Sequence, residues 1–210
     1  MSFDDLPRFS DPARLAVLLS GSGRTLDNLL VHIDSGSLPA TIPLVIASRA
    51  CLGAEKARAA GIETHVHHGP LDGAWLDELC WRHEIDLVVL AGYLRLVPIT
   101  DALRHRVINI HPALLPDFGG RGMHGEAVHA AVLEAARAGR VRESGCTVHF
   151  AEEAYDTGST IVQLRCPVDP GDTPEQLAAR VFDLECAAYP DALRMLIERN
   201  ASASRTKSNA

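Results

Sequence analysis

The strongest constraint on the fold is a regular alternation of short apolar runs with helix-like segments from residue 14 onward. Apolar runs indicate buried strands, whereas apolar residues spaced three and four apart indicate helices. Strands and helices that alternate in this way predict a parallel sheet with right-handed crossovers and helices on both faces. The predicted strands are 15–19, 42–47, 64–66, 87–90 and 107–111, and the predicted helices are 25–33, 54–59, 74–83, 100–104 and 125–138.

The pattern changes after residue 140. Two β-rich runs, 147–150 and 161–168, are separated by about ten residues without a helical pattern, which predicts an antiparallel hairpin. A helix over 174–198 then closes the domain, with Thr173 as its N-cap and an interruption near Pro190. We therefore predict one α/β domain over residues 14–200, with solvated tails at 1–13 and 201–210.

Composition excludes several classes of protein. The chain is 47% hydrophobic and 22% charged, which fits one compact globular domain. It contains no run of about 20 apolar residues, and the start MSFDDLPRF lacks the basic and apolar regions of a signal peptide. These features predict a cytoplasmic protein without a membrane partner. A net charge of −7, with dispersed Lys and Arg, predicts no nucleic-acid surface.

Cysteine and histidine spacing does not favour a metal site. The five cysteines, at positions 51, 80, 146, 166 and 186, form no C-x-x-C pair, so they predict small buried side chains rather than a disulfide framework or a zinc site. His65 and His67 would share a face of a strand, as metal ligands do, but no carboxylate or cysteine is near in sequence. We predict that the protein holds no metal.

Two polar side chains end an otherwise apolar strand in the sequence Val107-Ile108-Asn109-Ile110-His111. Alternate residues of a strand share a face, so Asn109 and His111 point the same way. Pro112 ends the strand, and open parallel sheets bind ligands at this edge. An amide donor beside an imidazole suits a reaction in which a carbonyl oxygen gains negative charge and a proton moves. The alternative is an Asn and a His that only satisfy the loop backbone.

The first strand is followed directly by Ser20-Gly21-Ser22-Gly23-Arg24-Thr25 and a helix. Backbone N–H groups in such a loop can face an anion, and the pattern predicts a phosphate site of mononucleotide type. A nicotinamide cofactor is disfavoured because Leu26 replaces the third glycine of the dinucleotide pattern, and no acidic residue ends the second strand. Arg49 keeps an NADP phosphate as a minority alternative. A tight turn without a ligand is the other alternative.

Asp156 lies in Tyr155-Asp156-Thr157-Gly158, on the loop of the predicted hairpin. A carboxylate beside an imidazole raises its pKa and fixes its orientation, so we expect Asp156 to keep His111 protonated if the two residues meet. Asp-Thr-Gly is also an ordinary turn sequence, which is the competing interpretation.

Taken together, these segments resemble the folate-dependent glycinamide ribonucleotide formyltransferases over nearly the whole predicted domain. Six blocks occur in order, and N-I-H-P-x-L-L-P is the most specific of them. They are S-G-S-G-R-T-L near the start, V-V-L-A-G-Y-L-R-L-V at 88–97, N-I-H-P-A-L-L-P at 109–116, G-C-T-V-H-F at 145–150, Y-D-T-G at 155–158 and E-C-A-A-Y-P at 185–190. The resemblance implies a single Rossmann-like formyltransferase domain.

The resemblance also implies a reaction and its residues. A formyl group would pass from 10-formyltetrahydrofolate, the co-substrate, to the amine of glycinamide ribonucleotide in purine biosynthesis, without a metal or a nicotinamide. The catalytic positions are Asn109, His111 and Asp156. The nucleotide-binding positions are Gly21, Ser22, Gly23, Arg24, Thr25 and Glu185. The folate-binding positions are Leu94, Arg95, Leu96, Val97 and Asn109. The implied assembly is a monomer or a homodimer.

Three alternatives remain open at the level of sequence. Methionyl-tRNA formyltransferase shares the catalytic pattern but normally adds a C-terminal tRNA domain, and formyltetrahydrofolate hydrolase typically adds an N-terminal regulatory domain. A non-catalytic nucleotide-binding module would use the glycine loop alone. The loop Phe118–Met123 has the composition of a flexible lid, with Arg121 reaching the substrate, or of an ordinary surface loop.

Overall fold

The computed structural model describes the backbone of residues 8–208 and the side chains of residues 8–202. The fold is a single α/β domain with a seven-stranded, mostly parallel sheet in the order β3-β2-β1-β4-β5-β6-β7. The strands are β1 (Ala13–Leu19), β2 (Ala40–Ala47), β3 (Glu63–Val66), β4 (Leu87–Leu90), β5 (Val107–His111), β6 (Glu143–Phe150) and β7 (Thr160–Pro167). The helices are α1 (Arg24–Asp34), α2 (Leu52–Ala59), α3 (Gly73–Arg82), α4 (Glu126–Arg137) and α5 (Pro174–Ser208).

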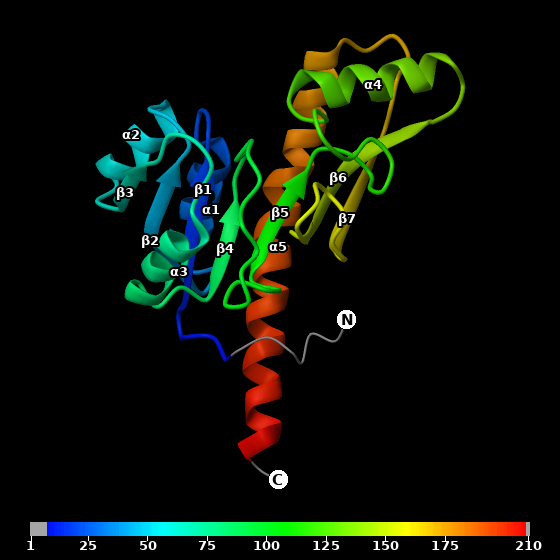
Figure 1. Ribbon diagram of the computed structural model, residues 1–210. Coiled ribbons are helices and arrows are strands. Elements are labelled where there is room, and N and C mark those ends of the chain that lie inside the picture. The colour runs from blue at the N-terminus through cyan, green and yellow to red at the C-terminus, as the bar shows by residue number, and fades with distance from the viewer. Residues whose placement is uncertain (1–7, 209–210) are drawn as a thin grey trace. The chain divides into compact units, whose positions relative to one another are not determined.

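The chain forms two compact units, and the first comprises residues up to 108 together with the chain from 193. In this unit β1 pairs in parallel with β2 on one side and with β4 on the other, and β3 pairs with β2 (Figure 1). The strands therefore end at the same edge of the sheet. From β1 to β3 the chain adds each strand on one side of the sheet, and it then adds β4 on the other side of β1. Because crossovers are right-handed, this change of side places α3 on the face opposite to α1 and α2.

Apolar sequence explains why these strands form the centre of the first unit. The side chains of Leu15–Leu19 in β1 are fully buried, as are those of Leu87–Val89 in β4. Strands that are buried on both faces read as continuous apolar runs rather than as alternating patterns. Helix α3 begins at an N-cap, Asp72, whose carboxylate accepts a hydrogen bond of 2.9 Å from the Trp75 backbone N–H.

The second unit comprises residues 109–192. It contains the antiparallel hairpin that the sequence predicts, in which Thr147 of β6 lies opposite Gln163 of β7. Helix α5 begins with a capping box: the Thr173 hydroxyl accepts from the Gln176 N–H at 3.3 Å, and the Gln176 side chain accepts from the Thr173 N–H at 2.8 Å. The prediction of Thr173 as N-cap is confirmed.

The predicted helix over 100–104 is wrong, because this segment is a succession of turns. The Thr100 carbonyl accepts from the Leu103 N–H at 3.1 Å, and the Leu103 carbonyl accepts from the Arg106 N–H at 2.9 Å. These bonds span three residues rather than four. The Thr100 hydroxyl also bonds to Asp77 at 2.7 Å. Side-chain bonds of this kind compete with helix formation, which has a costly first turn.

The predicted end and interruption of the last helix are also wrong. Helix α5 runs from Pro174 to Ser208 and passes through Pro190. A proline inside a helix removes one backbone hydrogen bond, and here its cost is offset by packing because Ala188, Tyr189 and Ala192 are fully buried.

The predicted tails lie partly outside the described residues, namely at 1–7 and 209–210. Before β1, the Phe9 N–H donates to the Asn200 side chain at 2.8 Å, and the Ser10 N–H donates to Asp86 at 3.1 Å. Within residues 8–208, no helix is both long enough and apolar enough to cross a bilayer.

Candidate functional site

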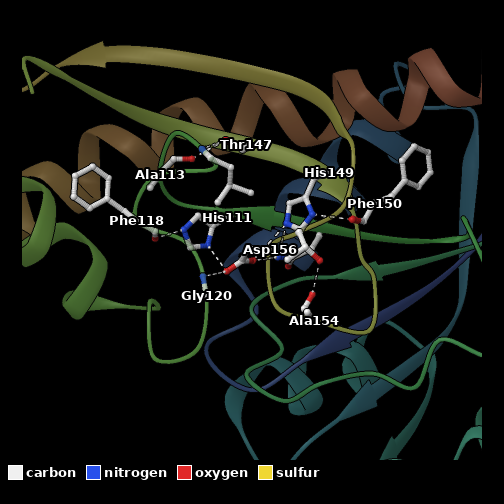
Figure 2. A network of polar contacts seen from close by, with 12 residues as sticks. His111, Ala113, Phe118, Gly120, Thr147, His149, Phe150, Ala154 and Asp156 are labelled. Carbon is white, nitrogen blue, oxygen red and sulfur yellow. Dashed lines mark hydrogen bonds and ion pairs between the residues drawn. The ribbon is translucent and has the colours of Figure 1, made fainter. Parts of the chain in front are cut away.

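Asn109 and His111 both face Asp156, as the strand alternation predicts for two residues that share a side. Figure 2 shows His111 beside Asp156. The Asn109 side-chain nitrogen lies 3.3 Å from Asp156 Oδ1, and His111 Nδ1 lies 3.5 Å from Asp156 Oδ2. All three residues belong to the second unit. The structure therefore brings the three predicted catalytic residues together around one carboxylate.

The loop between β6 and β7 holds Asp156 in an unusual backbone conformation. Its φ of 58° lies in the left-handed region, which Asp adopts more readily than most residues. Asp156 Oδ2 accepts a hydrogen bond of 2.9 Å from the Gly120 N–H. At Gly158 a Cβ atom would lie 1.8 Å from the Phe150 carbonyl oxygen. The glycine of the Asp-Thr-Gly sequence is therefore required by a close approach of the backbone.

Two opposing influences set the pKa of His111, and burial opposes the effect of Asp156 on which our expectation rests. Burial lowers the pKa of His111 below its ordinary value, and outweighs Asp156 and the Phe118 hydrogen bond, which raise the pKa. The His111 side chain is 4% exposed, so its charged form loses most of its hydration. His111 Nε2 donates a hydrogen bond of 2.8 Å to the Phe118 carbonyl oxygen.

A fourth residue, His149 of β6, completes the site and was not singled out by sequence reasoning. Its Nε2 atom lies 3.1 Å from the Asn109 side-chain nitrogen and 3.5 Å from Asp156 Oδ1. Its Nδ1 atom lies 2.8 Å from the Phe150 carbonyl oxygen. The available signal was its place in a block of the resemblance, Gly145-Cys146-Thr147-Val148-His149-Phe150, on the strand beside β5. We call Asn109, His111, His149 and Asp156 the Asp156 cluster.

Asp156 is the ionised member of this cluster. Its burial raises the pKa, but the interaction with His149, the Gly120 hydrogen bond and the charges available to the two histidines together lower the pKa of Asp156 below its ordinary value. The side chain of Asp156 is only 8% exposed. A carboxylate that stays charged while it is largely buried can accept a proton from a reacting group with little reorganisation.

A cavity of about 500 Å³ lies beside Asp156 within the second unit. It is bounded by two loops, one that follows β5 and one that joins β6 to β7. Its lining residues are Leu115, Pro116, Gly119, Gly120, Tyr155, Asp156, Thr157, Gly158 and Thr160. The carboxylate is therefore accessible to a small molecule.

The predicted phosphate-binding residues 20–25, here called the glycine loop, belong to the first unit. Gly23 is the N-cap of α1, with φ of 76° and no side-chain cap. A Cβ atom at Gly23 would lie 2.6 Å from the Cα atom of Gly53, and the Gly53 N–H donates to the Gly21 carbonyl at 3.0 Å. Glycine is therefore needed here for packing against α2, whether or not the loop binds an anion.

The predicted folate-binding residues begin beside the glycine loop in the same unit. The Leu94 N–H donates to the Ser20 hydroxyl at 3.2 Å, and the Ser48 hydroxyl donates to the same oxygen at 2.6 Å. The side chain of Leu96 is exposed, as is that of Leu94, whereas Val97 is buried. An exposed pair of leucines next to a polar loop suits an aromatic ligand of mixed polarity.

The remaining predicted residues are placed as follows. Arg95 donates to the Gly69 carbonyl at 2.7 Å, so its guanidinium fixes a neighbouring loop. Glu185 lies on α5 in the second unit, where its charge adds to the effect of burial in raising the pKa of Cys146 to about 12. Arg49 donates to the Ser20 carbonyl at 2.9 Å.

Among the described residues, no group of three His, Cys, Asp or Glu side chains is arranged to hold a metal ion.

Comparison with known proteins decides the family. The family model described as formyl transferase matches residues 13–193. This chain belongs to the formyl transferase family. A solved formyl transferase structure, glycinamide ribonucleotide transformylase 1 from Symbiobacterium toebii, has a TM-score of 0.79 at 38% identity, covering 88% of this chain and 87% of that chain.

Two further proteins to which this chain is similar carry different names. A chloroplastic phosphoribosylglycinamide formyltransferase from Arabidopsis thaliana is 40% identical over 195 residues, which cover 88% of this chain and 65% of the plant protein. A formyltetrahydrofolate deformylase from Pseudomonas syringae pv. tomato has a TM-score of 0.74 at 27% identity, covering 89% of this chain and 61% of that one. The chain thus spans less than two thirds of either relative.

Proposed function

We propose that the protein transfers a formyl group from 10-formyltetrahydrofolate to the amine of glycinamide ribonucleotide, giving formylglycinamide ribonucleotide and tetrahydrofolate. The observation that carries the proposal is the convergence of Asn109 and His111 on the ionised carboxylate of Asp156, in a chain of the formyl transferase family. The names of the plant and Symbiobacterium relatives support the choice of nucleotide.

In the proposed reaction the amine nitrogen attacks the formyl carbon, and the formyl oxygen gains negative charge. The Asn109 amide has two hydrogens, directed at His149 Nε2 (3.1 Å) and at Asp156 Oδ1 (3.3 Å). The longer contact is the weaker one, so the formyl oxygen would replace Asp156 as its acceptor. Loss of such a donor typically reduces turnover by about 10²–10³-fold.

The protons that must move during the reaction suggest roles for Asp156 and His111. The new carbon–nitrogen bond forms as the bond from carbon to N10 of the folate breaks; the amine loses one proton, and N10 gains one. Asp156 is ionised and, once Asn109 has turned to the formyl oxygen, has an oxygen free to accept the proton from the amine. His111, whose Nδ1 atom lies 3.5 Å from Asp156 Oδ2, provides a second base along the path to N10.

The polarity of the two predicted binding segments indicates which substrate each one binds. The glycine loop opens helix α1 with no side-chain cap, which suits the nucleotide phosphate. The exposed Leu94 and Leu96 suit the folate ring system. No metal or nicotinamide takes part in this scheme, and we place the reaction in the cytoplasm.

The test is an assay of folate release. Purified protein is mixed with glycinamide ribonucleotide and a 10-formylfolate, and formation of the deformylated folate is followed with and without the nucleotide. Release that depends on the nucleotide and is lost in His111→Ala supports the proposal. Release without the nucleotide would instead assign the activity named for the Pseudomonas relative. No release under either condition would overturn the proposal and direct the search to a tRNA acceptor.

A further inference from the structure

The two histidines of the Asp156 cluster carry their ring protons on opposite nitrogens. His111 places Nε2 2.8 Å from the Phe118 carbonyl oxygen, whereas His149 places Nδ1 2.8 Å from the Phe150 carbonyl oxygen (Figure 2). A carbonyl oxygen can only accept a hydrogen bond, so the ring nitrogen that faces it must carry the hydrogen. Nε2 of His111 and Nδ1 of His149 therefore each carry a hydrogen.

The Asp156 carboxylate settles the orientation of the Asn109 amide, because an ionised carboxylate only accepts hydrogen bonds. The amide nitrogen of Asn109 therefore faces Asp156 Oδ1, at 3.3 Å. The same nitrogen lies 3.1 Å from Nε2 of His149, whereas that Nε2 atom lies 3.5 Å from the carboxylate. A hydrogen on Nε2 would point at the N–H₂ donor, so Nε2 accepts from Asn109, and His149 carries its ring proton on Nδ1.

We propose that His149 is a positioning residue for the proposed formyl transfer, which holds the Asn109 amide with its N–H₂ group toward the reacting centre through the lone pair on Nε2. The inference rests on the proposed function. One amide hydrogen stays on His149 during the reaction, and the other leaves Asp156 for the formyl oxygen. Without an acceptor at Nε2, the amide can turn and present its oxygen to the developing negative charge, which is repulsive.

His149 is too deeply buried to act as a catalytic residue, which would have to touch a substrate. Its side chain is 1% exposed, and both of its ring nitrogens are occupied by other residues of the protein. It has no surface with which to touch a substrate. Its effect must therefore pass through Asn109, and it should change kcat much more than the KM of either substrate.

Three substitutions of His149 separate its two hydrogen bonds. In His149→Gln, the side-chain carbonyl reaches the position of Nε2 and restores an acceptor for Asn109. In His149→Asn, the shorter amide reaches only the position of Nδ1, toward Phe150. His149→Leu removes both bonds. We expect kcat to fall by less than about tenfold for Gln and by about 10²-fold or more for Asn and Leu, because a misplaced donor at the oxyanion costs this much.

A control variant and a spectroscopic measurement keep the test decisive. Val148→Ala truncates a buried residue on the same strand and should leave kcat near that of the unsubstituted protein. Histidine ¹⁵N–¹H correlation spectra at neutral pH should show His149 protonated on Nδ1 and His111 on Nε2. Equal losses in Gln and Leu, or a His149 that carries a hydrogen on Nε2, would overturn the inference. If the unsubstituted protein transfers no formyl group, the proposed function fails, whereas the spectra still decide the orientation of Asn109.

Discussion

The glycine loop of the first unit and the Asp156 cluster of the second unit are built from different parts of the chain. The glycine loop presents backbone groups, and its geometry depends on the missing Cβ atom of Gly23. The Asp156 cluster consists of buried and half-buried side chains. Burial lowers the pKa of His111, whereas hydrogen bonds and the two histidines lower the pKa of Asp156. The fold of the glycine loop should therefore tolerate exchange of its polar side chains but not a Cβ atom at Gly23. The activity of the Asp156 cluster should change when one atom is exchanged and the shape of the side chain is kept.

The largest expected effect is on the Asp156 cluster. Asp156→Asn keeps the size of the side chain but removes the proton acceptor and the charge. Under the proposed function kcat should fall by about 10²–10⁴-fold, while the KM for the nucleotide changes little. Steady-state kinetics with both substrates measures this split, and Thr157→Ser, a neighbouring change on the exposed loop, is the control. An Asn variant that keeps most of its kcat would remove Asp156 from the mechanism.

The glycine loop should respond in stability. Gly23→Ala places a Cβ atom 2.6 Å from the Cα atom of Gly53, at a φ of 76°. We expect a loss of about 1–3 kcal/mol in the free energy of unfolding from this crowding and strain. At Gly21 a Cβ atom would meet nothing within 4 Å, so Gly21→Ala is the matched control for urea unfolding. Equal stability of the two variants would contradict the packing described for α2.

A smaller effect is expected in the dependence of stability on pH. Burial lowers the pKa of both His111 and His129 below the ordinary value of 6.5. Above pH 6.5 both forms of the chain are neutral at these positions. As the pH falls below 6.5, the unfolded chain binds protons that the folded chain does not, so the free energy of unfolding decreases.

Urea unfolding between pH 8 and pH 5 measures this slope. His129→Leu removes one of the two groups and should make the slope shallower, because His129 is buried and its Nδ1 atom has no hydrogen-bond partner. A stability that rises toward pH 5 would contradict neutral buried histidines.

The smallest effect concerns the cysteines, which lie outside both regions. Burial raises the pKa of Cys80 and Cys146 to about 12, and it also raises the pKa of Cys166. Cys51 and Cys186 are partly exposed. In a timed reaction with a thiol reagent, we therefore expect two cysteines to react quickly and three only on unfolding. A third fast cysteine in the folded protein would indicate local opening of the hairpin or of α3.

The sequence was most informative where local chemistry decides the structure. The apolar strand that ends in Asn109-Ile110-His111-Pro112 predicts two side chains on one face, and both face Asp156. Thr173 predicts the start of α5 correctly. In each case the signal lies within a few residues, so no tertiary information is needed.

The sequence failed where burial decides the outcome. The pKa of His111 depends on burial, which lowers it, as well as on its neighbour Asp156, which raises it. The role of His149 depends on a carbonyl oxygen at Phe150 and an amide on another strand. The passage of α5 through Pro190 likewise depends on buried side chains around it. The burial of His111 and the course of α5 have no pattern in the linear sequence, and His149 is marked only by its place in the block 145–150.

The most direct test of the account follows the formyl carbon itself. A 10-formylfolate labelled with ¹³C in the formyl group is incubated with glycinamide ribonucleotide and the protein, and NMR follows the label. The account predicts that the label appears in a new amide of the nucleotide in amounts equal to the folate released. Label recovered as formate, or left on the folate, would contradict it.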